Sequence, residues 1–207
     1  MAMSDTYFTL EGPCEGLFKA KGSKHFGYGF PVVSEEEVAQ HLMALRKRHH
    51  AARHVAYAWR LGYDDTWHRA NDDGEPSNSA GPPILGVIRA HDLTNVLFAV
   101  VRYFGGTKLG VGGLIEAYRE GAAEALRNGN VVERIRTERI RVAFSYENMG
   151  VAMGLVKKWG LEPVDTDFQL SCTLDVEVRL AEATSFKQAV LDTRLLALPD
   201  APSSQDG

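Results

Sequence analysis

The fold is decided by the stretch NVLFAVVRYFGGTKLGVGG, residues 95–113. Its first part, residues 95–104, is a nearly continuous apolar run, which is typical of a strand that is buried on both faces. The second part, residues 105–113, is rich in glycine, which tolerates positive φ angles and lets a ligand approach the main chain. We therefore expect a buried strand, a glycine-rich loop, and then a helix over residues 114–128 that ends at Gly129.

Working outward from this stretch, the residues before it predict the rest of a first domain. Ser34 and Glu37 are spaced as a capping box, in which the hydroxyl accepts from the Glu37 amide while the carboxylate reaches back, so a helix begins here. Alternation and β-branched or aromatic content favour strands, and polar, Gly- and Pro-rich content favours loops. The remaining elements expected are strands at 18–33 and 54–61, a loop at 62–83 and a short helix at 84–90.

The residues after this stretch predict a second, smaller domain. A strand, a helix, two strands and a helix are expected at 139–146, 148–159, 161–169, 172–180 and 183–193. This order suggests a ferredoxin-like domain, with residues 194–198 as the candidate for its last strand. The fold class is therefore α+β with two domains, at residues 1–132 and 137–200, followed by a flexible tail at 201–207.

Composition restricts the function classes. The formal net charge of −4 excludes a global basic field that would steer the protein to nucleic acid or to an anionic membrane, although a local basic patch is still allowed. Only Cys14 and Cys172 are present, which excludes a disulfide framework and favours two reduced structural thiols. With neither a signal peptide nor a membrane-spanning run in the sequence, we expect a cytoplasmic protein with no membrane partner.

The glycine-rich loop is the first candidate site. Its glycines precede a helix N-terminus, where free amides favour an anion, and Lys108 lies within the loop. The loop is not a P-loop, because the lysine comes early and Leu114 follows the last glycine. Tight turns and close helix packing are the alternative use of these glycines. The binding residues predicted here are Arg102, Gly105, Gly106, Lys108, Gly110, Gly112 and Gly113.

The acidic segment of residues 72–76 is the second candidate site. Asp72, Asp73 and Glu75 are close enough in sequence to hold Mg²⁺ with retained waters, or to accept hydrogen bonds from cationic and amide donors, and Pro76 restricts their turn. Short acidic loops are usually only solvated, and contact with Lys108 or Arg102 is the more economical use of the charge. We therefore predict binding here without a required cofactor, and Mg²⁺ as the alternative.

A basic segment offers further contacts. The side chains of Arg46, Lys47, Arg48 and Arg53 are candidates for contact with a phosphate backbone. Complementation of the helix dipole explains the same charges equally well. The His-x-x-x-His spacing of His50 and His54 is expected to be incidental, because the helix ends between them.

Two long motifs carry a family resemblance. They are DDGEPSNSAG, residues 72–81, and NVLFAVVRYFGGTKLGVGGLIEAY, residues 95–118. In this order they resemble the signature of the YigZ/IMPACT family, an uncharacterised protein family with an Impact-type N-terminal domain. The chain departs from the pattern at Asn78 and Ser79, where the family usually has glycine and threonine, and at Lys24-His25, where it usually has Arg-Phe.

The resemblance implies a fold and a range of functions. The first domain would be ribosomal-protein-like, with a left-handed βαβ crossover, and the second would be similar to a ferredoxin-like domain of elongation factor G. Eukaryotic relatives are linked to translational control through a stress kinase, and bacterial relatives are suggested to bind nucleic acid or ribosomes. These expectations rest on analogy, because a fold does not fix a function.

Our leading hypothesis from the sequence is a non-enzymatic binding or regulatory protein linked to translation, with RNA or the ribosome as its partner. One alternative is a Mg²⁺-dependent enzyme acting on a phosphorylated small molecule or phosphoester. The other is a protein–protein regulatory module, whose partner would dock on the two loops. No residue is predicted to be catalytic, because no nucleophile with a placed base is evident.

Overall fold

The computed structural model describes residues 5–63, 65–168 and 172–199. The chain divides into two compact units. The larger unit is Tyr7–Arg134, and the smaller one begins at Ile135 and also includes described residues 5 and 6. Within the described residues, no helix is long and apolar enough to cross a membrane.

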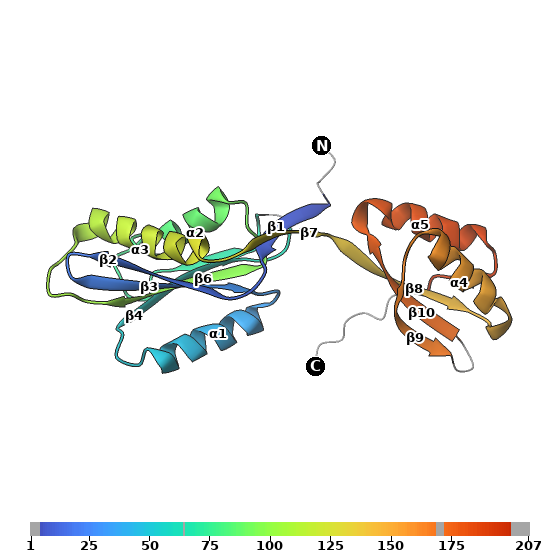
Figure 1. Ribbon diagram of the computed structural model, residues 1–207, viewed down its shortest axis with the longest axis horizontal. Helices are drawn as coiled ribbons and strands as arrows, with labels where there is room; N and C mark the ends of the chain where they lie inside the picture. Colours follow the sequence, from blue (N-terminus) through green and yellow to red (C-terminus); the bar gives the residue numbers. More distant parts are fainter. Residues whose placement is uncertain (1–4, 64, 169–171, 200–207) are drawn as a thin grey trace. The chain divides into compact units, whose positions relative to one another are not determined.

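A five-stranded sheet forms the centre of the larger unit (Figure 1). The order of its strands is β2-β3-β6-β4-β5, and every neighbouring pair is antiparallel. The strands are β2 (Cys14–Ala20), β3 (Ser23–Pro31), β4 (His54–Arg60), β5 (His68–Asn71) and β6 (Val96–Tyr103). The apolar run predicted as a buried strand is thus the middle strand β6, and the first six residues of β6 are buried.

Helices cover both faces of this sheet, which is why the first six residues of its middle strand are all apolar and buried. The helices α2 (Gly81–Ala90) and α3 (Gly110–Arg127) lie on one face, and α1 (Glu35–Arg48) lies on the other (Figure 1). Along β6, Phe98 and Val100 belong to the core under α2 and α3. Ala99 and Val101 alternate with them and belong to the core on the side of α1.

The capping box predicted for α1 is present. The Glu37 amide donates to the Ser34 hydroxyl at 3.2 Å, and the Glu37 carboxylate accepts from the amide of Val33 at 2.8 Å. The cap therefore satisfies the amide of Glu37 in the first turn, and the Glu37 carboxylate reaches back to Val33, the residue before the N-cap.

Several predicted boundaries in this unit are wrong. The strand expected over residues 18–33 is a hairpin, because Lys21 and Gly22 both take positive φ angles and turn the chain. Helix α3 begins at Gly110, inside the segment expected to be a loop. Strand β5 lies inside the loop expected at 62–83, and strands β1 (Thr6–Leu10) and β7 (Val131–Ile135), which pair with each other, were not predicted.

The smaller unit contains the element order of a ferredoxin-like fold. Its elements are β8 (Thr137–Phe144), a 3₁₀ turn η1 (Tyr146–Asn148), α4 (Met149–Lys158), β9 (Pro163–Phe168), β10 (Cys172–Arg179), α5 (Leu180–Asp192) and β11 (Leu196–Ala197). The antiparallel sheet has the order β11-β8-β10-β9. Residues 196–197 thus supply the last strand, and the mixed α/β class expected for the chain is confirmed. The tail predicted at 201–207 lies outside the described residues.

Candidate functional site

A cationic pocket of about 810 Å³ lies at the end of the sheet where β6 meets the glycine-rich segment. Its charged and polar side chains are Arg53, His54, Glu75, Arg102 and Lys108. The other residues that line it are Ala51, Pro76, Tyr103, Phe104, Leu109, Gly110, Val111 and Leu114. The single carboxylate is outnumbered by two arginines and a lysine, so the lining attracts an anion although the chain as a whole is acidic.

The sheet places two side chains of the pocket, those of Arg102 and His54, in one row with the buried ring of His25. In the register, His25 of β3 and His54 of β4 both lie opposite Arg102 of β6. Paired residues point to the same face, and Phe98 and Val100 show that this is the face covered by α3. The side chains of this row therefore lie between the sheet and α3, where Arg102 and His54 approach Glu75 of the acidic segment.

Glu75 neutralises the middle of this row. Its Oε1 atom lies 2.7 Å from Nη1 of Arg102 and accepts a hydrogen bond from the Tyr118 hydroxyl, also at 2.7 Å. Both partners of the ion pair are largely buried. Burial, together with the Glu75 hydrogen bond, raises the pKa of Tyr118 far above its usual range, so the phenol stays a donor. Arg102 is thus held by the protein itself, while Arg53 and Lys108 make no ion pair among the described residues.

Asp72 has a structural role. Its Oδ1 atom accepts from the amides of Ala80 and Gly81, at 2.9 and 2.8 Å, and its Oδ2 atom accepts from Asn78 at 2.8 Å. These amides lie at the start of α2, whose own cap residue contributes no side-chain bond. The carboxylate therefore satisfies the free N–H groups of a helix end.

Asp73 joins the same segment to α1 and β4. It accepts from Nη2 of Arg46 at 2.8 Å and from the amide of Val55 at 2.6 Å. Burial acts to raise the pKa of Asp73, but these hydrogen bonds and the charge of Arg46 hold it below its usual range. The carboxylates of Asp72, Asp73 and Glu75 thus serve three separate sets of partners. In the part of the chain that the structure describes, no group of three or more His, Cys, Asp or Glu side chains is arranged to hold a metal ion.

His54 is the functional candidate that the sequence interpretation missed. Its Nδ1 atom lies 2.7 Å from the carbonyl oxygen of Asp73, and since a carbonyl only accepts, Nδ1 carries a proton. Nε2 lies 4.0 Å from Glu75 Oε1, and the ring lines the pocket. In the neutral ring Nε2 is therefore a proton acceptor at the pocket wall. This role depends on the contact between His54 and the Asp73 carbonyl, which lies 19 residues away in the sequence, and the spacing to His50 does not indicate it.

The glycines of residues 105–113 have separate roles. Gly105 is a packing residue, because a Cβ there would meet the carbonyl carbon of Gly22 at 1.9 Å. Gly106 and Gly110 take positive φ angles, and a Cβ on Gly112 would have open space around it. Gly113 lies in the first turn of α3, where a Cβ would approach Leu109. The helix start has neither a side-chain cap nor an acidic residue, and Gly110 and Val111 line the pocket.

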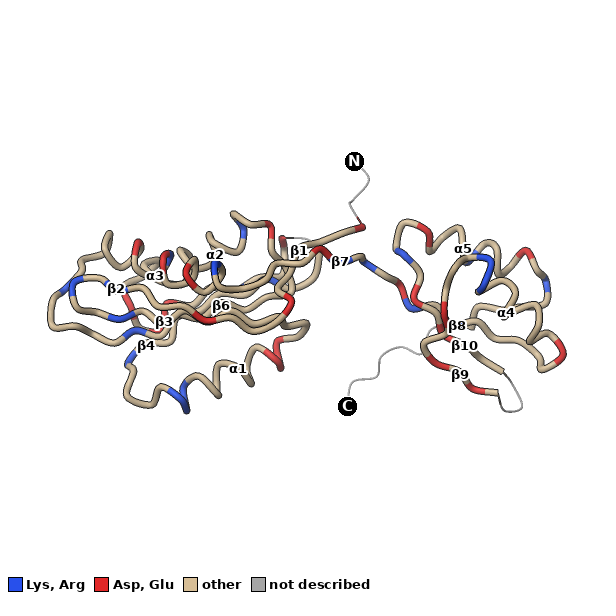
Figure 2. Tube along the Cα trace, in the orientation of Figure 1, with Lys and Arg blue, Asp and Glu red and all other residues tan. Residues whose placement is uncertain are grey.

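The four basic residues predicted to contact phosphate differ in their surroundings, because two of them form ion pairs within the protein and two form none among the described residues. Arg46 pairs with Asp73, and Arg48 lies 3.2 Å from Glu15. Arg53 lines the cationic pocket, and Lys47 is exposed but does not line it. Figure 2 shows Lys and Arg along the β2–β3 hairpin and at the C-terminal end of α1, with the acidic residues of α1 at its other end.

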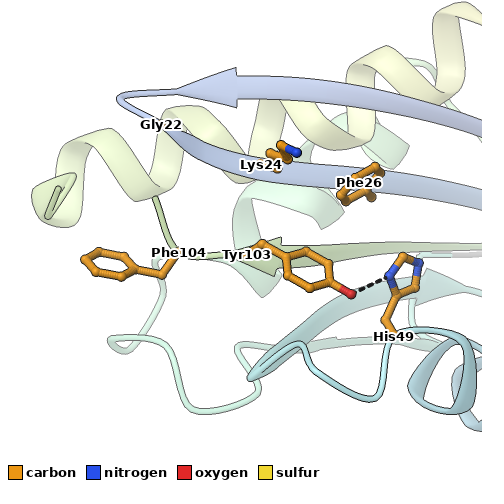
Figure 3. A pocket seen from close by; sticks show the side chains of 6 residues that line it. All are labelled: Gly22, Lys24, Phe26, His49, Tyr103 and Phe104. Atoms are coloured by element: carbon orange, nitrogen blue, oxygen red, sulfur yellow. Dashed lines mark hydrogen bonds between the residues drawn. The ribbon is translucent and has the colours of Figure 1, made fainter. Parts of the chain in front are cut away.

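A second pocket of about 370 Å³ adjoins the first (Figure 3). It is lined by Gly22, Lys24, Phe26, His49, Tyr103 and Phe104. Tyr103 and Phe104 also line the cationic pocket, so the two pockets meet at the end of β6. The aromatic lining was not predicted, because Phe26 and Tyr103 come from strands that are distant in sequence and adjacent only in the sheet.

A family model described as the Impact N-terminal domain matches residues 21–126. The IMPACT family member YvyE of Bacillus subtilis is 39% identical over 64% of this chain, and the chain spans 61% of that relative's length. An IMPACT family member of Thermus thermophilus is 40% identical over 68% of this chain and 75% of its own length. The resemblance found in the sequence motifs is confirmed.

One solved structure is similar along nearly the whole chain. It is titled as the crystal structure of a hypothetical protein, and it covers 96% of this chain and 100% of its own. The TM-score is 0.72 at 24% sequence identity, so the likeness concerns the fold alone.

Proposed function

This chain belongs to the IMPACT family, which includes YigZ of Escherichia coli, and from that premise we propose that it is a regulatory binding protein whose cationic pocket takes the phosphate backbone of RNA. The observation that carries the proposal is the lining of the pocket at the end of β6. Two cations there, Arg53 and Lys108, make no ion pair among the described residues, and the uncapped start of α3 adds free amides. A partner in translation, the ribosome included, is the setting that the family resemblance implies.

Charge balance supports this choice of ligand. Among the described residues that line the pocket, the one carboxylate is that of Glu75, and it is paired with Arg102, so Arg53 and Lys108 are left to bind an anion from outside. Each cation that neutralises a phosphate releases condensed counterions, which makes the affinity fall steeply with salt. A pocket built around internal ion pairs alone would not produce such a dependence.

The test is a salt titration of RNA binding by fluorescence anisotropy. The wild-type chain is expected to bind a labelled RNA with a steep negative slope of log affinity against log salt. Lys108→Ala should weaken binding to all RNA sequences alike and reduce that slope by about one unit. Lys157→Ala, at an exposed lysine of α4, is the matched control and should change neither quantity. Binding that is insensitive to salt, or equal losses in both variants, would overturn the proposal.

A specific observation favours a second candidate, an enzyme acting on a phosphoester. His54 presents Nε2 as a proton acceptor at the wall of the same pocket, as a general base requires. A panel of phosphoesters, each tried with and without Mg²⁺, tests it. Turnover that is lost in His54→Gln while RNA affinity is unchanged would support this candidate, and the absence of turnover across the panel would remove it.

A further inference from the structure

The aromatic pocket beside the cationic one contains the surfaces that a nucleobase needs. Figure 3 shows Phe26, Tyr103 and His49 lying along one face of the sheet, with Phe104 beyond the end of β6. Phe104 is 59% exposed, and the guanidinium carbon of Arg102 lies over its ring, 5.7 Å from the centroid. The part of the ring that Arg102 does not cover lies at the junction of the two pockets and is available to a ligand.

The rings of Phe26 and Tyr103 are held in place by the register of the sheet. Lys24 lies opposite Tyr103, and Phe26, two residues along β3, is its diagonal neighbour. The two rings meet edge to face with centroids 5.8 Å apart. Lys24 lies on the same face because strand residues alternate, so a cation stands beside the aromatic lining.

His49 forms a neutral wall of this pocket. Its Nδ1 atom lies 3.0 Å from the Tyr103 hydroxyl and its Nε2 atom 2.7 Å from the Tyr28 hydroxyl, so both ring nitrogens are occupied. Burial, with the nearby charge of Arg48, lowers the pKa of His49 despite the opposing charge of Glu15. A phosphate finds no free donor on this ring, whereas a flat apolar ligand finds a surface.

We infer that the two pockets together bind one unpaired stretch of nucleic acid, with phosphate beside Lys108 and a base stacked in the pocket of Phe26, Tyr103 and Phe104. The inference rests on the proposed function and specifies its ligand as a single strand. A duplex keeps its bases paired and stacked, so it can reach the cations but not the aromatic lining. A single strand can turn a base outward as it passes the end of β6. The exposed aromatic ring next to unpaired cations is the combination used for single strands without strong sequence preference.

The test compares four probes on one set of variants. They are a labelled RNA single strand of about 10 nucleotides, the DNA strand of the same sequence, the corresponding RNA duplex, and inorganic polyphosphate, which has charge but no bases. Phe104→Ala is expected to weaken single-strand binding about 5- to 100-fold and to leave polyphosphate binding unchanged. Phe104→Trp, which keeps a stacking surface, should restore the single-strand affinity. Phe8→Ala, at another exposed aromatic residue of the same unit, is the matched control.

The outcomes separate the inference from the proposed function. Loss of single-strand affinity in Phe104→Ala, with rescue by tryptophan, supports the inference, and comparison of the RNA and DNA strands then shows whether the ribose contributes. Equal binding of duplex and single strand, or equal losses for polyphosphate, overturns it. If polyphosphate and duplex bind through Lys108 and Phe104→Ala has no effect, the proposed function stands alone. If the wild-type chain binds none of the probes, both fail. Thermal unfolding of each variant confirms that it is folded.

Discussion

The Glu75 carboxylate lies 2.7 Å from the Arg102 guanidinium, and the two side chains are only 4% and 10% exposed. The pair joins the acidic segment to the middle strand of the sheet. A buried ion pair contributes little compared with a well-packed apolar pair, but removing one partner leaves a charge without compensation. The ion pair therefore fixes the position of the acidic segment, residues 72–76, relative to β6 at the pocket.

Glu75→Gln should lower the free energy of unfolding by about 3–5 kcal/mol, because it strands the Arg102 charge in a buried site. Urea denaturation measures the loss. The double variant Glu75→Gln/Arg102→Met should recover most of it, since no buried charge remains. If Glu75→Gln has the same free energy of unfolding as the wild type, the ion pair does not hold the acidic segment in place.

Asp72→Ala should lower the free energy of unfolding by about 2 kcal/mol, because three amides near the start of α2 lose their acceptor. Asp72→Asn keeps one acceptor oxygen and should lose less. Both variants should keep the wild-type affinity for polyphosphate, since Asp72 does not line the cationic pocket. A selective loss of affinity in the asparagine variant would instead give Asp72 a direct role in binding.

His25 predicts a loss of stability in acid. The ring is completely buried, and neither nitrogen has a hydrogen-bonding partner among the described residues. Burial, with the charge of Arg102, lowers its pKa to about 4 from 6.5, against the opposing effect of Glu75. Well above pH 6.5 the ring is neutral in the folded and the unfolded chain, so it has no effect on the pH dependence of stability there.

As the pH falls below 6.5, only the unfolded chain takes up the proton at His25. The free energy of unfolding therefore falls until about pH 4, by about 3 kcal/mol in total. Urea midpoints measured across this range should fall less in His25→Leu than in the wild type. The variant retains the smaller contribution of His49, whose pKa is also lowered. Parallel pH profiles for the two proteins would contradict the assignment.

Gly27 and Gly112 should respond in opposite ways to alanine. A Cβ on Gly27 would lie 1.9 Å from the carbonyl oxygen of Gly121, so α3 would have to move off β3. We expect a loss of more than about 3 kcal/mol in the free energy of unfolding. Gly112 has open space inside a helix, and alanine there should gain about 0.5–1 kcal/mol. Calorimetric melting of both variants decides the matter, and a stable Gly27→Ala would show that the close approach is not required.

Patterns among residues close in sequence determine much of the architecture without reference to tertiary contacts. The capping box at Ser34 and the apolar run of β6 are properties of neighbouring residues, so the helix and the middle strand were found. The turn at Lys21-Gly22 was missed because a lysine with positive φ gives a weak signal. The start of α3 was misplaced because glycine is a poor helix former, and here packing outweighs that propensity.

The sequence predicts binding in two segments, and the structure brings Glu75, Pro76 and Lys108 of these segments to one pocket, whereas it gives others of the predicted residues separate contacts. Lys108 was predicted at an anion site, and the structure places it in a cationic pocket. Asp72 and Asp73 were grouped with Glu75 as one binding set, whereas each serves different partners. The spacing of His54 from His50 does not predict a role for His54. Its position depends on a contact with the Asp73 carbonyl, which joins two separate segments of the chain.

By itself, the sequence determined the family, the mixed α/β class and the two segments that meet at the pocket, because these depend on motifs and on short-range periodicity. Only the tertiary structure decided which charges are left for a ligand. Antiparallel pairing places His25, Arg102 and His54 in one row, and Glu75 then neutralises the middle of it. Arg53 and Lys108 remain without an ion pair among the described residues, since no described carboxylate reaches them. Whether a charge is paired depends on the distance between side chains in the folded protein, and these side chains are far apart in the sequence.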